Sequence, residues 1–97
     1  MMHGMDIETI WERIERYEGE TFHTITGIPF EYEVMLDDRH GNERIQPIPH
    51  NGSKIFPITK ETMEQCLYLM PLKNTTPLQK FKAPSYIFAI LTDKRIV

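Results

Sequence analysis

The chain contains one cysteine, Cys66, and no apolar run longer than the six residues Tyr86 to Leu91. A single cysteine excludes an intramolecular disulfide and a four-cysteine zinc site. A run of six is far below the roughly 20 apolar residues of a membrane-spanning helix, so no membrane partner is expected. Residues 1–5 lack the features of a secretory signal. We therefore expect a cytoplasmic protein whose residues 1–5 are a disordered or tag-derived N-terminus.

Residues that usually bind metals or phosphates are few and poorly spaced. No two of the histidines stand at the i, i+4 interval of a helical zinc motif, and no His-Glu-x-x-His pattern occurs. The glycines are isolated and form no phosphate-binding loop. We expect neither a metal site nor a cofactor. The histidines are His3, His23, His40 and His50.

Two weak signs of catalysis have simpler explanations. Cys66 could serve as a nucleophile beside a histidine, but a free cysteine on the apolar face of a helix usually behaves as a small buried residue. Glu31 and Glu33 could resemble an acid and base pair, although a solvent-facing strand explains them equally well. The sequence therefore predicts a protein that is not an enzyme. The apolar residues that share the helical face of Cys66 are Met63, Leu67 and Met70.

Charge is distributed unevenly along the chain. Residues 1–49 carry four basic and eleven acidic side chains, a net of −7, whereas residues 50–97 carry seven basic and three acidic ones, a net of +4. These halves sum to the net charge of −3. Such a field can dock the halves, pair copies head to tail or steer a polyanion to one face. A plain alternative is that each element has a solvated outer face.

The first 20 residues predict an amphipathic helix. Asp6 is a good N-cap, Gly19 is a plausible stop, and the apolar residues between them recur at helical spacing. This apolar stripe should lie on the core with Trp11 at its centre. The stripe comprises Ile7, Ile10, Trp11, Ile14 and Tyr17.

Strands follow, because residues 21–26 are rich in β-branched and aromatic types and residues 30–36 alternate apolar with polar. A polar turn over 37–42 leads to a third strand over 44–48. Pro47 and Pro49 cannot donate to a ladder, which predicts an edge position for that strand. Residues 53–56 fit either a short strand or a long loop that starts at residue 50.

The remaining chain predicts two C-terminal helices. Thr59 can cap the first, which should run until Pro71 ends it. Residues 86–91 are apolar all round, so periodicity leaves helix and buried strand open; Ser85 as an N-cap favours a short helix. The fold class is therefore a small α+β domain over residues 6–97, with a helix, a two- to four-stranded antiparallel meander and two further helices.

The basic second half points to a nucleic-acid partner. Lysine and arginine bind backbone phosphates without reading sequence, and an aromatic face can stack on an unpaired base. Against this, the pI of about 5.8 is low for a nucleic-acid binder, so the acidic first helix must face away. Arg95 has an alternative structural role, bonded to Asp93 or to the first helix. The predicted face comprises Lys54, Lys60, Lys80, Lys82 and Arg95, with Tyr86 as the stacking residue and Phe56 and Phe81 interleaved.

A protein-interaction or self-associating module is the alternative function. An acidic helix, a lysine-bearing loop and an outer strand could pair with a protein partner or form a homo-oligomer by complementary charge or by strand addition. Salt-sensitive retention on DNA or RNA would favour the first function, and a dimer without such retention the second.

Two segments carry a resemblance to a known group. Residues 27–32 read Gly-x-Pro-Phe-x-Tyr, and residues 84–96 read Pro-Ser-Tyr-x-x-Ala-Ile-Leu-x-Asp-x-Arg-Ile. Over about residues 20–96 the chain resembles short uncharacterised bacterial and phage-associated proteins that share these patterns. The resemblance implies a free-standing bacterial-type cytosolic domain. It brings no activity, cofactor or site residue with it.

Overall fold

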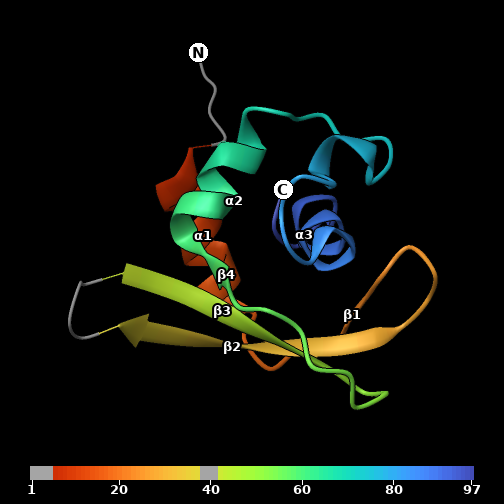
Figure 1. The fold of residues 1–97 in the computed structure, drawn as a ribbon. Helices are drawn as coiled ribbons and strands as arrows, with labels where there is room; N and C mark the ends of the chain where they lie inside the picture. The colour runs from red at the N-terminus through yellow and green to blue at the C-terminus, as the bar shows by residue number, and fades with distance from the viewer. Residues whose placement is uncertain (1–5, 38–41) are drawn as a thin grey trace.

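Helices cover one face of a twisted antiparallel sheet in the computed structural model (Figure 1). The structure describes residues 6–37 and 42–97. These residues form three α-helices, four strands in the consecutive order β1-β2-β3-β4, and one 3-10 turn. This arrangement confirms the predicted α+β class. The elements are α1 (Ile7–Arg16), β1 (Phe22–His23), β2 (Pro29–Asp37), β3 (Asn42–Pro49), β4 (Ile58–Thr59), α2 (Lys60–Leu67), η1 (Thr76–Leu78) and α3 (Pro84–Leu91).

Helix α1 begins at its predicted cap. The Asp6 carboxylate accepts the backbone N–H of Thr9 at 2.8 Å, which satisfies one of the free donors of the first turn. Ile10, Trp11 and Ile14 are buried, Glu12 is exposed, and the half-buried Arg13 donates to the Ile96 carbonyl at 3.0 Å. The expected apolar stripe is thus confirmed at its centre.

The position of β3 differs from the edge strand that its prolines predicted. β3 lies between β2 and β4, so it is an inner strand. However, β4 pairs only with Arg44 and Ile45, and no strand among the described residues pairs with the proline half on that side. Pro47 and Pro49 stand opposite Tyr32 and Phe30 of β2. These two pairs exchange no backbone hydrogen bonds, because in an antiparallel pair of strands only every second residue pair is hydrogen-bonded. The bond from His50 N–H to Pro29 O shows that the hydrogen-bonded pairs are the ones in between. The missing N–H groups therefore point to the open side, which is why an inner strand tolerates two prolines.

Residues 51–57 form no strand, so of the two alternatives for residues 53–56 the long loop is confirmed. This loop runs beside the proline half of β3 instead, and the side chain of Gln46 holds it by donating to the Ile55 carbonyl at 2.7 Å. Most of the predicted turn over 37–42 lies outside the described residues, in positions 38–41.

Helix α2 starts at the predicted cap, where the Thr59 hydroxyl accepts the N–H of Thr62 at 3.1 Å. It ends at Leu67, earlier than expected. Residues 86–91 are helical, as favoured, but α3 begins at Pro84 with Ala83 as its N-cap rather than Ser85. Proline fits the first turn because its φ is already helical and the first N–H has no helical partner.

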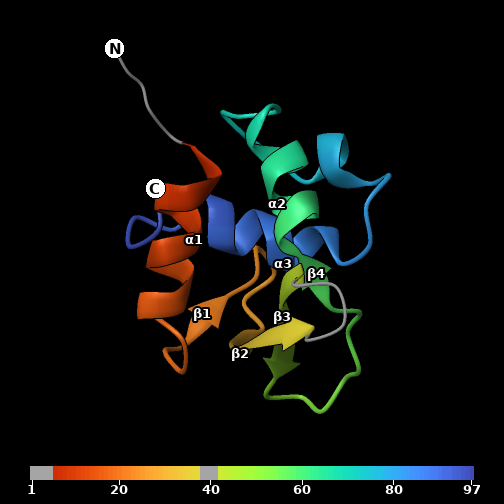
Figure 2. The same ribbon diagram turned by 90° about the vertical axis from the view of Figure 1, so that its left-hand side faces the viewer.

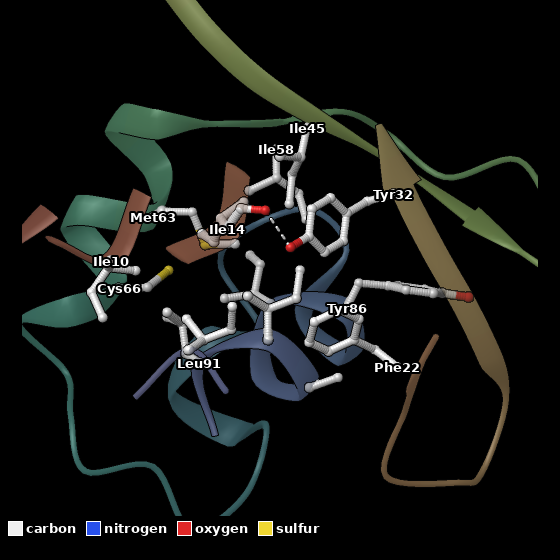
Figure 3. Packing of buried hydrophobic residues seen from close by; sticks show 14 of the residues in the cluster. Ile10, Ile14, Phe22, Tyr32, Ile45, Ile58, Met63, Cys66, Tyr86 and Leu91 are labelled. Atoms are coloured by element: carbon white, nitrogen blue, oxygen red, sulfur yellow. Dashed lines mark hydrogen bonds between the residues drawn. The ribbon is translucent and has the colours of Figure 1, made fainter. Parts of the chain in front are cut away.

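Side chains from both layers meet in one core (Figure 3). Helix α3 can be apolar on all its faces, because Ile87, Ile90 and Leu91 are fully buried and most of the rest of its surface is covered. One buried polar contact joins the layers: the Tyr32 hydroxyl donates to the Ile14 carbonyl at 2.6 Å (Figure 3). That carbonyl belongs to the last turn of α1, whose oxygens need partners from outside the helix. The largest fully buried side chains are Trp11, Tyr32, Phe22, Phe30, Ile10, Ile14, Ile45, Ile58, Met63, Leu78, Ile87 and Ile90.

Candidate nucleic-acid interface

Lys60 is held by the acidic side of the molecule rather than offered to a partner. Its Nζ lies 3.1 Å from Glu8 Oε1 of α1 and 3.4 Å from Glu43 Oε1 of β3, and its side chain is only 25% exposed. Burial acts to lower the pKa of Lys60, but the hydrogen bonds and attraction from Glu8 and Glu43 outweigh it and raise the pKa. Glu43 also accepts the indole N–H of Trp11 at 2.8 Å. Lys60 therefore stabilises the junction of α1, α2 and β3.

A shallow hollow of about 350 Å³ opens at this junction. Among the described residues, its charged lining is mainly carboxylate, with Lys60 as the one cation. A polyanion would be repelled there. The charged residues of the lining are Glu8, Glu43, Lys60, Glu61 and Glu64.

Arg95 takes the structural role that the sequence left open. Its guanidinium donates to both carboxylate oxygens of Asp93 at 2.9 and 3.0 Å and to the Thr21 carbonyl at 2.9 Å. It also lies flat on the buried ring of Phe22, with Cζ 3.9 Å from the ring centroid. The hydrogen bond from Arg95 lowers the pKa of Asp93, and the same bond raises the pKa of Arg95. Arg95 thus fixes the C-terminal segment to the turn before β1.

Tyr86 is part of the core. Its residue surface is 7% exposed, and its ring meets Phe30 edge to face with centroids 4.8 Å apart. Neither ring face is open to a base, so the stacking role that the sequence suggested has no geometric support. Burial also raises the pKa of the Tyr86 phenol.

The other three lysines come from two segments that meet. The Nζ of Lys82, just before α3, lies over the ring of Phe56 at 4.1 Å from its centroid, so the segment 79–83 and the loop 51–57 touch at this pair. Lys54 belongs to that loop, and Lys80 lies over its own neighbour Phe81 at 5.3 Å. All three lysines are exposed, and none forms an ion pair within residues 6–37 and 42–97. We call Lys54, Lys80, Lys82 and Phe56 the lysine patch.

Comparisons with protein-family models, with curated proteins and with solved structures find no match. The ring of the lysine patch, Phe56, is 60% exposed, about as much as Ile25 and Leu36.

The lysine patch and the acidic helix lie on different sides of the molecule. In Figure 2, α1 is on the left and the segment that joins η1 to α3 is on the right, with α2 and α3 between them. Exposed glutamates of α1 and the turn after it therefore lie away from Lys80 and Lys82. Lys80 and Lys82 thus lie apart from the carboxylates of α1, whereas Lys60, from the same basic half of the sequence, is paired with Glu8 and Glu43. The exposed acidic residues on the α1 side are Glu8, Glu12, Glu15, Glu18 and Glu20.

In the ranges 6–37 and 42–97, no three histidine, cysteine or carboxylate side chains gather closely enough to bind a metal ion. No helix within those ranges has the length and hydrophobicity to cross a bilayer.

Proposed function

We propose that this protein binds single-stranded nucleic acid through the lysine patch, without reading its sequence. The observation that carries the proposal is the meeting of Lys82 with the exposed ring of Phe56, on the side of the molecule away from α1. Lysine ammonium groups attract backbone phosphates, and each contact releases a counterion from the strand.

The exposed ring of Phe56 favours single-stranded nucleic acid over a duplex as the ligand. An exposed ring can stack on a base only when that base is unpaired, and such stacking is worth about 1–3 kcal/mol per base with little regard to base identity. Lys82 covers one face of Phe56 in the free protein. On binding, its ammonium would transfer to a phosphate while the ring takes a base.

The proposed site contains Lys54, Lys80 and Lys82 of the face that the sequence predicted. Phe56, which the sequence analysis placed only between the lysines, becomes the stacking residue. Lys60, Tyr86 and Arg95 stay outside it, because each is already engaged in the fold. The low overall pI does not oppose local binding, since a patch of three cations separated from the acidic helix can attract a strand on its own.

Fluorescence anisotropy with a labelled thymidine oligonucleotide, at about 50 mM salt, tests the proposal. The double variant Lys80→Gln/Lys82→Gln should lose affinity by about eightfold for each lysine. Each phosphate contact contributes about 0.7 to the slope of log affinity against log salt concentration, so its loss weakens binding most at low salt. Phe56→Leu should weaken the single strand and leave any duplex binding unchanged.

Arg16→Gln/Lys94→Gln is the matched control, because both side chains are exposed and the variant removes the same charge from outside the patch. Equal loss in the control and in the Lys80/Lys82 variant would show that net charge alone sets the affinity. No measurable binding of the unaltered protein would reject the proposed function.

A further inference from the structure

One edge of the sheet is left open along the end of β2. β1 pairs with β2 only at Pro29 and Phe30, so the rest of β2 has no strand on that side among the described residues. The N–H of Thr24 donates to the Ile28 carbonyl, and the N–H of Val34 donates to Glu18 Oε2 at 2.8 Å. The backbone N–H and C=O groups of the even-numbered residues of β2 therefore face the open side, because these groups point to alternate sides along a strand.

Accessibility along this edge is uneven. Tyr32 is 1% exposed, which closes its backbone to a partner. Val34 is half-buried, Leu36 is 62% exposed and Met35 is 38% exposed. The accessible edge is thus the segment 33–36, with the backbone groups of Val34 and Leu36 directed outward. We call this segment the β2 edge.

The opposite side of the sheet offers no comparable edge. Pro47 and Pro49 have no N–H to donate there, and the loop 51–57 runs alongside them. Proline and covering loops are common ways to protect an edge. Within residues 6–37 and 42–97, the β2 edge has one such protection, the side chain of Glu18, which can rotate away.

We infer that the β2 edge accepts an extended segment of another protein whose residues alternate between basic and apolar. Strand addition of this kind gains its affinity from main-chain hydrogen bonds and its specificity from alternate side chains. Glu33 is exposed on the outer face of β2 and Glu18 stands at the edge itself, so a basic residue would find a carboxylate in either place. Val34 and Leu36 lie on the other face, where an apolar residue would cover them.

Glu18 has two roles in this arrangement. In the free protein its carboxylate accepts the Val34 N–H and keeps the edge from pairing indiscriminately. When a basic segment docks, a carbonyl of the segment takes the Val34 N–H, and the Glu18 carboxylate pairs with a lysine or arginine instead. A neutral segment would displace Glu18 without offering it a partner.

Charge argues against a second copy of this chain as the occupant. Antiparallel pairing of two β2 edges about Val34 would gather Glu18 and Glu33 of both copies at one junction. The two Glu33 side chains would be diagonal neighbours on one face, close enough for their like charges to repel. A basic partner has the opposite effect. The β2 edge is separate from the lysine patch, so this inference does not depend on the proposed nucleic-acid binding.

Titration with synthetic peptides tests the inference. The probe is Lys-Val-Lys-Val-Lys-Val, labelled and blocked at both ends, and its counterpart carries Glu in place of Lys. We expect the lysine peptide to bind and the glutamate peptide not to bind. The variant Glu18→Lys/Glu33→Lys should reverse this preference, with roughly tenfold weaker binding of the lysine peptide, because both carboxylates that would pair with its lysines become cationic.

Controls separate strand addition from simple charge attraction. Glu61→Lys/Glu64→Lys changes two exposed carboxylates of α2 and should leave peptide affinity unchanged, as should Lys80→Gln/Lys82→Gln. Two further peptides are N-methylated, one on its valine amides and the other on its lysine amides. Only one set of amides can face β2, so one methylated peptide should lose binding and the other should keep it.

Three results would overturn the inference. The first is equal affinity of both methylated peptides and the parent, which would indicate charge attraction without strand pairing. The second is absence of binding to the lysine peptide. The third is a dimer of the free protein in sedimentation that excess peptide dissociates, which would make a second copy the occupant.

Discussion

Replacing Tyr32 by phenylalanine tests how the two layers are joined. The Tyr32 hydroxyl is buried and bonds to the Ile14 carbonyl at 2.6 Å, and no other donor among the described residues reaches that oxygen. Phenylalanine keeps the ring but leaves a buried carbonyl without a partner, which costs about 1–3 kcal/mol. For a domain of this size, each kcal/mol lowers Tm by roughly 4–8 °C.

Urea unfolding followed by tryptophan fluorescence is a suitable assay, because Trp11 is the only tryptophan and is buried. Tyr68→Phe is the matched control, since Tyr68 is 81% exposed and its change should stay within about 0.5 kcal/mol. A Tyr32→Phe variant with the urea midpoint of the unaltered protein would refute the reasoning.

The same substitution should change the response to alkali. Burial raises the pKa of the Tyr32 phenol well above the value of about 10 in an unfolded chain. The folded state therefore holds this proton more tightly, and the resulting stability is present below about pH 10 and is lost as the pH rises above it. The unaltered protein should lose stability more steeply than Tyr32→Phe between about pH 10 and 11.

The fold also predicts the behaviour of three residues outside the lysine patch. Lys60→Gln should leave oligonucleotide affinity within about twofold of the unaltered protein and lower stability by up to about 1 kcal/mol, as measured by anisotropy and urea unfolding. Arg95→Gln should likewise spare affinity while lowering stability by about 1–3 kcal/mol, because the Thr21 carbonyl and the Asp93 carboxylate lose their donor. A tenfold loss of affinity in either variant would return that residue to the interface. Burial raises the pKa of the Cys66 thiol to about 11, so a thiol reagent at pH 8 should label it only as fast as the protein unfolds.

Local signals in the sequence predicted the elements well. The side chains of Asp6 and Thr59 cap helices at the expected positions, because capping depends on a donor only three residues away. The two prolines of β3 misled the prediction of strand order. These prolines indicate only that one side of the second half of β3 is unpaired. Strand order also depends on β4, which pairs with the first half of β3 on that same side.

The candidate site was harder to predict, since it depends on contacts between distant segments. The partners of Lys60 are Glu8, which is 52 residues away, and Glu43, which is 17 residues away. No spacing rule links such positions. The pairing of Lys82 with Phe56 is equally remote, although an exposed-looking Phe56 between Lys54 and a proline was a usable sign. The bond from Val34 to Glu18 had no sequence signal at all, because it depends on which side of β2 remains unpaired.

The salt dependence of oligonucleotide binding tests the central claim most directly. Three lysine contacts predict a slope of about −2 in log affinity against log salt, or roughly a 20-fold loss of affinity between about 50 and 200 mM. The triple variant Lys54→Gln/Lys80→Gln/Lys82→Gln should bring this slope close to zero, while Arg16→Gln/Lys94→Gln keeps it. A triple variant with the slope of the unaltered protein would contradict the assignment of nucleic-acid binding to the lysine patch.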